Sequence, residues 1–257
     1  MTSFRAYVSD FRRFLVGKLP FTQSILLARL RRQREFGLGG LDSKIASVID
    51  LKRGFYIEIG ANDGVNQSNT LQLELFHGWR GVLIEPVPST FSRLKKNRNT
   101  KRNHLEQAAC VGFDYAKDEV EMVYSNLMSA SLNLNSDIED PIGHAKKGVG
   151  FLKGEDVNGA LRIVTAPALT MTSVLKKANA PTNIDLLSLD VEGAELEVLG
   201  GIDFKLFTIS WILVESRDLK RISHFLEPRG YSLHSPISDH DYLFHLENQA
   251  YSNSRSG

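Results

Sequence analysis

Residues 55–64, Phe-Tyr-Ile-Glu-Ile-Gly-Ala-Asn-Asp-Gly, predict both the fold and the place of the functional site. The first five residues favour a buried strand, because apolar and aromatic residues dominate it, and Gly60 ends that strand. The turn that follows contains a second glycine, Gly64, and glycines let backbone amides approach a ligand closely. Doubly wound α/β folds bind nucleotides at such a turn, at the carboxyl end of the first parallel strand.

The spacing of the two glycines excludes the two best-known phosphate-binding turns. Gly60 and Gly64 are separated by three residues, which is not the dinucleotide fingerprint, and no Gly-Lys-Ser/Thr follows as in a phosphate loop. Glu58 and Asp63 flank the turn, and two acids favour a cationic or hydroxyl-rich ligand over a pyrophosphate. A plain strand-to-helix turn is the alternative interpretation, because Gly, Asn and Asp are common turn residues.

The alternation of strand and helix patterns continues along most of the chain. Strands are predicted at 81–85, 104–111, 184–189 and 209–214, with closing segments at 231–234 and 242–246, and helices at 44–52, 68–77, 89–98, 172–178, 192–199 and 219–228. This rhythm is typical of a mostly parallel sheet with helices on both faces. Residues 112–168 interrupt it: short strand patterns at 120–124 and 161–164 enclose a polar stretch that is expected to be a structureless insertion near the active edge.

Composition describes an ordinary globular chain with one uneven feature. The 257 residues are 42% hydrophobic and 24% charged, with a net charge of +1, which gives no global field for nucleic acid. Residues 1–34 nevertheless carry +7, and the remainder carries −6. Within residues 1–36, Pro20 separates two short amphipathic patterns. They are expected either to cover the sheet or a dimer partner, or to lie on an anionic membrane surface.

Cysteine content and apolar runs indicate the compartment. Cys110 is the single cysteine, so no disulfide forms within the chain. Apolar aliphatic runs reach about four residues, far short of the ~20 that a transmembrane helix needs. We therefore expect a cytoplasmic protein, with residues 1–36 as the point of any peripheral contact at the inner membrane face. The predicted organisation is a basic helical extension (1–40), a catalytic domain (41–249) and a disordered tail (250–257).

Three acids at predicted strand ends are candidates for chemistry. Glu85 lies about 20 residues beyond the glycine turn, where a carboxylate accepts hydrogen bonds from ribose hydroxyls. Asp190 and Glu215 end the fourth and fifth predicted strands, so they are expected to meet at one edge of the sheet. Such a pair either binds Mg²⁺ or raises one pKa for acid–base work. The alternative is that one of them caps a neighbouring helix.

Several motifs together resemble the FkbM family of S-adenosylmethionine-dependent methyltransferases. The resemblance covers about residues 54–246. It rests on residues 58–64, Ser68-Asn69-Thr70, Glu74, Trp79-Arg80-Gly81, Ile84-Glu85-Pro86, residues 189–195, Leu199-Gly200-Gly201 and residues 241–244. Where the family often has Thr-Leu-Asp, this chain has Thr170-Met171-Thr172.

The resemblance implies a class I methyltransferase (Rossmann-like) fold, with a seven-stranded sheet whose last strand is antiparallel. It also implies O-methylation of a sugar, glycan-like or polyketide-like hydroxyl. The cofactor-binding residues would be Glu58, Gly60, Ala61, Asn62, Asp63, Gly64, Ser68, Glu85, Pro86 and Asp190. Asp190, Glu192 and Glu215 would be the catalytic acids and bases, with His144 or His240 as further candidate bases.

Two other functions fit parts of the sequence. A non-catalytic module would bind S-adenosylmethionine through Gly60, Gly64 and Glu85 but lack a base near the methyl group. A nicotinamide-dependent oxidoreductase is disfavoured, because the fingerprint glycine is missing and acids occupy the turn.

Overall fold

The computed structural model describes residues 33–150 and 160–247. The chain divides into two units between Arg34 and Glu35, and every element below belongs to the second unit. The helices expected within residues 1–36 and the disorder expected for residues 250–257 fall almost entirely outside the described residues.

The larger sheet has seven strands in the order β10-β11-β9-β8-β1-β2-β3. The strands are β1 (Phe55–Ile59), β2 (Arg80–Ile84), β3 (His104–Glu106), β8 (Asn183–Leu189), β9 (Thr208–Glu215), β10 (Tyr231–Pro236) and β11 (Asp241–Leu246). Strand β11 is antiparallel to both of its neighbours, and the other pairings are parallel. This is the strand arrangement that the family resemblance implied.

Helices cover both faces of this sheet, as the strand–helix rhythm predicted. One face packs against α3 (Leu41–Ile49), α4 (Leu71–His77) and α5 (Pro88–Asn97). The other packs against α8 (Met171–Lys177), α9 (Glu195–Gly200) and α10 (Leu219–Leu226), which is followed by η3 (Glu227–Arg229). Because side chains alternate along a strand, β1 sends Tyr56 and Glu58 toward α4 and α5, and Ile57 and Ile59 toward the opposite core.

The predicted strand 104–111 is instead two strands in two sheets. After β3, the chain leaves the large sheet and forms β4 (Ala109–Val111) in a four-stranded sheet of order β4-β7-β5-β6. Residues 104–111 contain no glycine or proline, so the sequence gives no local signal for such a change of sheet. Strand β4 pairs in parallel with β7 (Ile163–Thr170), and β5 (Glu119–Val123) pairs antiparallel with β7 and β6 (Ala130–Ser131).

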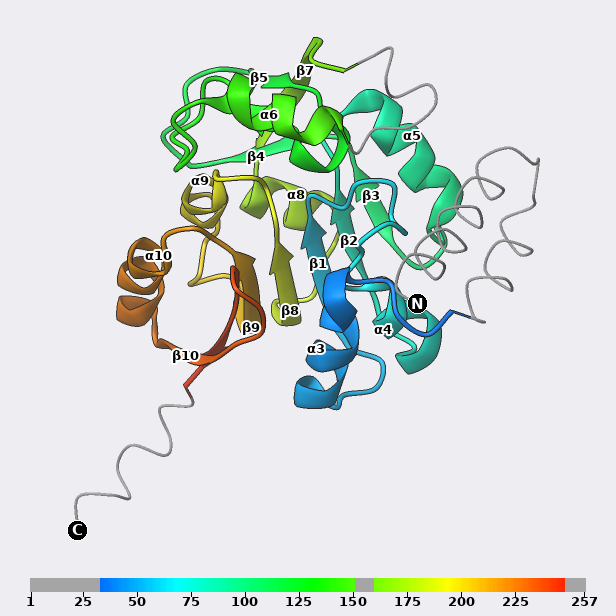
Figure 1. Ribbon diagram of the computed structural model, residues 1–257. Coiled ribbons are helices and arrows are strands. Elements are labelled where there is room, and N and C mark those ends of the chain that lie inside the picture. Colours follow the sequence, from blue (N-terminus) through cyan, green and yellow to red (C-terminus); the bar gives the residue numbers. More distant parts are fainter. Residues whose placement is uncertain (1–32, 151–159, 248–257) are drawn as a thin grey trace. The chain divides into compact units, whose positions relative to one another are not determined.

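The insertion 112–168 is therefore not structureless over its described residues. Between β5 and β7 it contains η2 (Asn126–Met128), β6 and the helix α6 (Pro141–Val149), where the Asp140 side chain caps the first turn. In Figure 1 this green segment lies beyond the carboxyl ends of β1 and β8, the ends to which their arrows point. It thereby covers the edge of the sheet at which ligands bind in doubly wound folds.

The first described helix begins earlier than predicted. Leu38–Gly40 form the turn η1, and α3 starts at Leu41. Asp42 lies inside its first turn and does not cap it; its carboxylate instead accepts a hydrogen bond from the Phe36 backbone amide (2.7 Å). None of the helices in the described part of the chain is long and apolar enough to cross a membrane.

Candidate functional site

The glycine turn after β1 brings three chain segments into close contact. Gly60 has φ 78°, and its amide and that of Ala61 both donate to the Ile84 carbonyl at the end of β2 (3.1 and 3.0 Å). A Cβ at Gly60 would lie 1.8 Å from the carbonyl oxygen of Asp190, which follows β8. Only glycine lets β1 and β8 end this close together at the pocket.

Glu85 lies directly beyond β2 and is almost completely buried. Its two carboxylate oxygens accept backbone hydrogen bonds from Asn62 (3.0 Å) and Val87 (2.9 Å). Burial raises its pKa to about 7, although these two bonds and the charge of Arg93 oppose the shift. The carboxylate therefore ties the glycine turn to the chain after β2, and it titrates near neutral pH.

A pocket opens where the two sheets meet, with about 710 Å³ of empty space when the open solvent at its mouth is included. Its lining contains six of the predicted site residues: Gly60, Asn62, Glu85, Pro86, Asp190 and Glu192. The remaining lining comes from Ile59, Val87 and Val191, from β4 and the connection before it, from α9 and the residue before it, and from the insertion. One pocket thus gathers residues from the ends of β1, β2 and β8, and the end of β8 lies more than 100 positions after the other two in the sequence.

The other predicted site residues do not line this pocket, and several belong to a buried network behind the turn. Asp63 accepts hydrogen bonds from the Val65 and Asn66 amides and shapes the turn itself. Glu58 points to the opposite side, where it accepts bonds from Ser68 Oγ, the Asn69 amide and Thr70 Oγ1. Ala61, Gly64, Ser68 and Glu215 are likewise absent from the lining.

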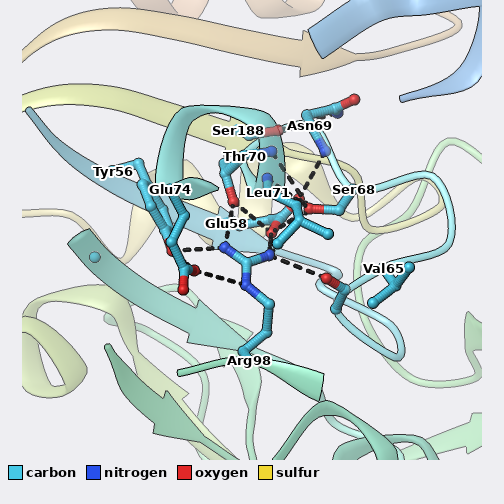
Figure 2. A network of polar contacts seen from close by, with 12 residues as sticks. Tyr56, Glu58, Val65, Ser68, Asn69, Thr70, Leu71, Glu74, Arg98 and Ser188 are labelled. Atoms are coloured by element: carbon cyan, nitrogen blue, oxygen red, sulfur yellow. Dashed lines mark hydrogen bonds and ion pairs between the residues drawn. The ribbon is translucent and has the colours of Figure 1, made fainter. Parts of the chain in front are cut away.

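Arg98 is the centre of that network, which Figure 2 shows from close by. Its side chain is fully buried, and its guanidinium contacts Glu58 (3.2 Å) and Glu74 (2.9 Å). It also donates to the Gly64 carbonyl, to Ser68 Oγ and to Thr70 Oγ1 (3.1–3.2 Å). A planar cation with five N–H donors suits this arrangement, because it joins β1, the turn and α4 at one point.

The end of α5 holds the turn by a second contact as well. Asn97 Nδ2 donates to the Asp63 carbonyl (2.8 Å), beside the bond from Arg98 to Gly64. Gly64 has φ 79°, and a Cβ there would lie 2.5–2.6 Å from Leu94 and Arg98. Asn97, the last residue of α5, and Arg98, which caps its end, therefore fix the two carbonyls that end the turn. No local signal in the sequence marks either residue, since polar and basic side chains at a helix end are usually solvated.

Asp190 and Glu215 lie together, as their places at two strand ends predicted. Their carboxyl groups share a hydrogen bond, and burial together with the charges of Glu215 and Glu192 raises the pKa of Asp190 well above its usual range. Burial and the charges of Glu192 and Asp241 also raise the pKa of Glu215. Like charges this close to Asp190 disfavour its ionised form, and a raised pKa makes that ionised form a stronger base.

Glu192 links this acidic edge to the insertion. Its backbone is left-handed (φ 53°), and its carboxylate lies 2.9 Å from His144 Nε2 on α6 and 3.0 Å from Arg217. The His144 contact is an ion-pair distance without hydrogen-bond alignment. Of the two candidate histidines, His144 thus lies beside a pocket residue, whereas His240 is exposed and does not line the pocket.

Comparison with known proteins decides the family. The family profile described as "Methyltransferase FkbM domain" matches residues 58–242, which is more than half of the chain. The chain belongs to the FkbM methyltransferase family. No curated protein sequence matches it at a significant level.

Solved structures with a similar fold share little sequence identity with this chain. Three of them are the METTL16 methyltransferase domain (12% identity, TM-score 0.43, 81% of this chain and 66% of that one), an FkbM methyltransferase from Methylobacillus flagellatus KT (12%, 0.41, 75% and 43%) and a methyltransferase from Geobacter sulfurreducens (14%, 0.41, 93% and 98%). The chain therefore spans slightly less than two thirds of the first of these and under half of the second. The class I fold follows from the strand order itself.

The family and fold imply S-adenosylmethionine as the cofactor, and the pocket residues fit it. Both side-chain polar atoms of Asn62 are buried without a hydrogen-bond partner, and Asn62 lines the pocket beside Glu85. A buried polar group without a partner is costly, so these atoms suit a polar ligand. No group of three or more His, Cys, Asp or Glu among residues 33–150 and 160–247 could hold a metal, so the Mg²⁺ interpretation of Asp190 and Glu215 gains no support.

Proposed function

We propose that this FkbM methyltransferase transfers a methyl group from S-adenosylmethionine to a hydroxyl of a saccharide, glycan-like or polyketide-like acceptor. The observation that carries the proposal is the meeting of two kinds of residue in one pocket. Glu85 and Asn62 supply polar groups suited to a nucleoside, and Asp190 supplies a carboxyl of raised pKa a short distance along the same edge.

In this proposal, Glu85 and Gly60 bind the cofactor. Ionised Glu85 accepts hydrogen bonds from the ribose hydroxyls, and the Gly60 backbone allows close approach of the amino-acid part. When bound, S-adenosylmethionine supplies a methyl group on a positively charged sulfur. The acidic pocket edge favours that charge.

The acceptor must lose a proton as its oxygen bonds to the methyl carbon and the carbon–sulfur bond breaks. Asp190 takes this proton in its ionised form, in which the raised pKa makes it a stronger base, and its hydrogen bond with Glu215 orients the carboxylate. Alignment of the acceptor oxygen with the methyl group supplies much of the remaining rate.

Calorimetric titration with S-adenosylhomocysteine tests the cofactor half. Glu85→Ala is expected to weaken binding about tenfold or more, which corresponds to about 1.4 kcal/mol. Glu106→Ala is the matched control, since Glu106 is a buried carboxylate at the end of the neighbouring strand β3 and lies outside the pocket. Equal affinity for the wild type and Glu85→Ala would contradict the assigned role.

Methyl transfer from labelled S-adenosylmethionine tests the catalytic half. Asp190→Asn is expected to lower kcat about 10²- to 10⁴-fold, because it removes the base but keeps the shape of the side chain. Its affinity for S-adenosylhomocysteine should stay within a few fold of wild type, since that molecule lacks the sulfonium charge. Retained kcat would remove Asp190 from the mechanism.

A further inference from the structure

One part of the pocket lining comes from the insertion and has no role in the proposal above. Strand β5, the turn η2 and strand β6 supply Val120, Met122, Asn126, Leu127, Ser129 and Ser131. Met122 pairs with Ser131 across the β5–β6 ladder, so their side chains share one face of the small sheet. We call these six residues the insertion wall.

Two polar atoms of the insertion wall have no partner in the protein. Ser131 is 4% exposed, and its Oγ makes no hydrogen bond. The buried Oδ1 of Asn126 makes none either, and Asn126 has left-handed backbone (φ 54°). An unpaired buried polar atom and an unfavourable backbone conformation each cost free energy, and both features concentrate at ligand sites.

The neighbouring hydroxyl shows that the segment is able to satisfy its own polar groups. Ser129 Oγ donates to the Asn126 carbonyl (2.7 Å) and accepts from the Ser125 amide (2.9 Å). These bonds fix the backbone of η2 while leaving the Asn126 side-chain oxygen unpaired. The free hydrogen-bonding capacity of the wall is therefore confined to Asn126 and Ser131, both of which line the pocket.

The charge of the pocket restricts what can bind against this wall. The ionisable lining residues include the acids Glu85, Asp190 and Glu192, and none of the described lining residues is Lys or Arg. An anionic acceptor would meet these acids with no cation among the described lining residues, since Arg217 lies outside the lining and is paired with Glu192, and such a contact is unfavourable in a partly buried site. An uncharged acceptor meets no such penalty.

We propose that the insertion wall is the acceptor-binding surface, in which Ser131 Oγ and Asn126 Oδ1 hydrogen-bond hydroxyls of an uncharged, hydroxyl-rich acceptor. Val120 and Met122 pack against its apolar faces, and the acids of the opposite edge exclude phosphorylated forms. This inference rests on the proposed function and adds to it the residues that select the acceptor.

The test compares neutral methyl hexopyranosides with the matching hexose 1-phosphates as methyl acceptors, using labelled S-adenosylmethionine. Wild-type protein is expected to methylate a neutral glycoside and to use its phosphate counterpart at least tenfold less efficiently in kcat/KM. Ser131→Ala and Asn126→Gly are each expected to raise KM for that glycoside about tenfold. Glycine is chosen at 126 because it keeps the left-handed backbone.

A second measurement separates the acceptor from the cofactor. Affinity for S-adenosylhomocysteine should be unchanged in both variants. Ser125→Ala is the matched control, because Ser125 is buried on the same segment, donates to the Ala145 carbonyl and does not line the pocket. It should leave KM unaltered even where it lowers the melting temperature.

Three results would overturn the inference. One is an unaltered KM for the glycoside in Ser131→Ala and Asn126→Gly. Another is a tenfold loss of S-adenosylhomocysteine affinity in these variants, which would mean that the wall binds the cofactor. The third is wild-type protein that binds S-adenosylhomocysteine but methylates no neutral glycoside, or prefers the phosphates. If wild type fails to bind S-adenosylhomocysteine at all, the proposed function itself fails, and that outcome is recognisable before any acceptor is added.

Discussion

The network of Glu58 and Arg98 behind the glycine turn differs from the insertion wall in how its buried polar groups are hydrogen-bonded. Behind the turn, Glu58 and Arg98 are buried, and each has several partners across β1, α4 and α5. In the wall, Ser131 and Asn126 keep buried oxygens without any partner. A network whose hydrogen bonds are all made within the protein is rigid before a ligand binds, whereas unpaired groups form their hydrogen bonds only with a ligand. We therefore expect the network behind the turn to be preformed and the insertion wall to select the acceptor.

The largest expected effect comes from breaking the network at its centre. Arg98→Met leaves Glu58 and Glu74 buried without their cation, and loss of one partner of a buried pair costs about 3–5 kcal/mol. Urea denaturation measures this free energy of unfolding. Lys96→Met, at an exposed position on the same helix, should change it by less than about 0.5 kcal/mol. A similar effect of both variants would mean that the network is not preformed.

A substitution in the turn should have the next largest effect. Gly60→Ala combines a left-handed backbone with a Cβ placed 1.8 Å from the Asp190 carbonyl. Gly39→Ala has the same kind of backbone (φ 60°) but meets no atom within 4 Å. Gly60→Ala should therefore destabilise by about 1–3 kcal/mol more than Gly39→Ala and also abolish S-adenosylhomocysteine binding. Equal losses would show that close approach of β1 and β8 is not required.

A pair of serine substitutions compares the two regions directly. Ser68→Ala removes a hydroxyl bonded to Glu58 and Arg98 and should cost about 1–3 kcal/mol of unfolding free energy. Ser131→Ala removes a hydroxyl without a partner, so stability should stay unchanged or rise slightly. Thermal denaturation of both proteins, side by side, checks the order. A larger loss of stability in Ser131→Ala than in Ser68→Ala would contradict the difference between the two regions.

The smallest expected effect is a pH dependence of S-adenosylhomocysteine binding, which arises from Glu85. The pKa of Glu85 is about 7 in the free protein, and the ribose needs the ionised carboxylate. Protonation below pH 7 therefore competes with binding, so affinity for S-adenosylhomocysteine should rise about tenfold between pH 6 and pH 8. At pH 6, binding should release close to one proton, which titrations in buffers of different ionisation enthalpy detect. Glu85→Gln should abolish both the slope and the release.

Sequence patterns predicted the large sheet because its signals are local. Buried strands such as Phe55–Ile59 end at glycine or an acid, and those ends lie at one edge when the strands are parallel. The meeting of Asp190 and Glu215 followed from the same geometry. Glu58 was harder to place, because its distance from the turn says nothing about which face of the strand it occupies.

The insertion could not be predicted in the same way. Strand β6 has two residues and η2 has three, which is too short for any periodic pattern. Nothing local marks Ser131 as different from Ser129, since the distinction lies in whether each hydroxyl finds a partner. The role of Arg98 was hidden for a related reason: its partners lie 24 to 42 positions away in the sequence.

The pairing of β4 with β7 has a consequence for how this fold can be changed. Ala109–Val111 lies beside Ala168–Thr170, so the chain leaves and rejoins the large domain at adjacent points. The entropy of closing such a loop grows only slowly with its length. A segment grafted from a related enzyme between β4 and β7 would therefore be attached at two points that already lie side by side. The acceptor preference that we propose for the insertion wall would move with such a segment, while the network around Arg98 would stay unchanged.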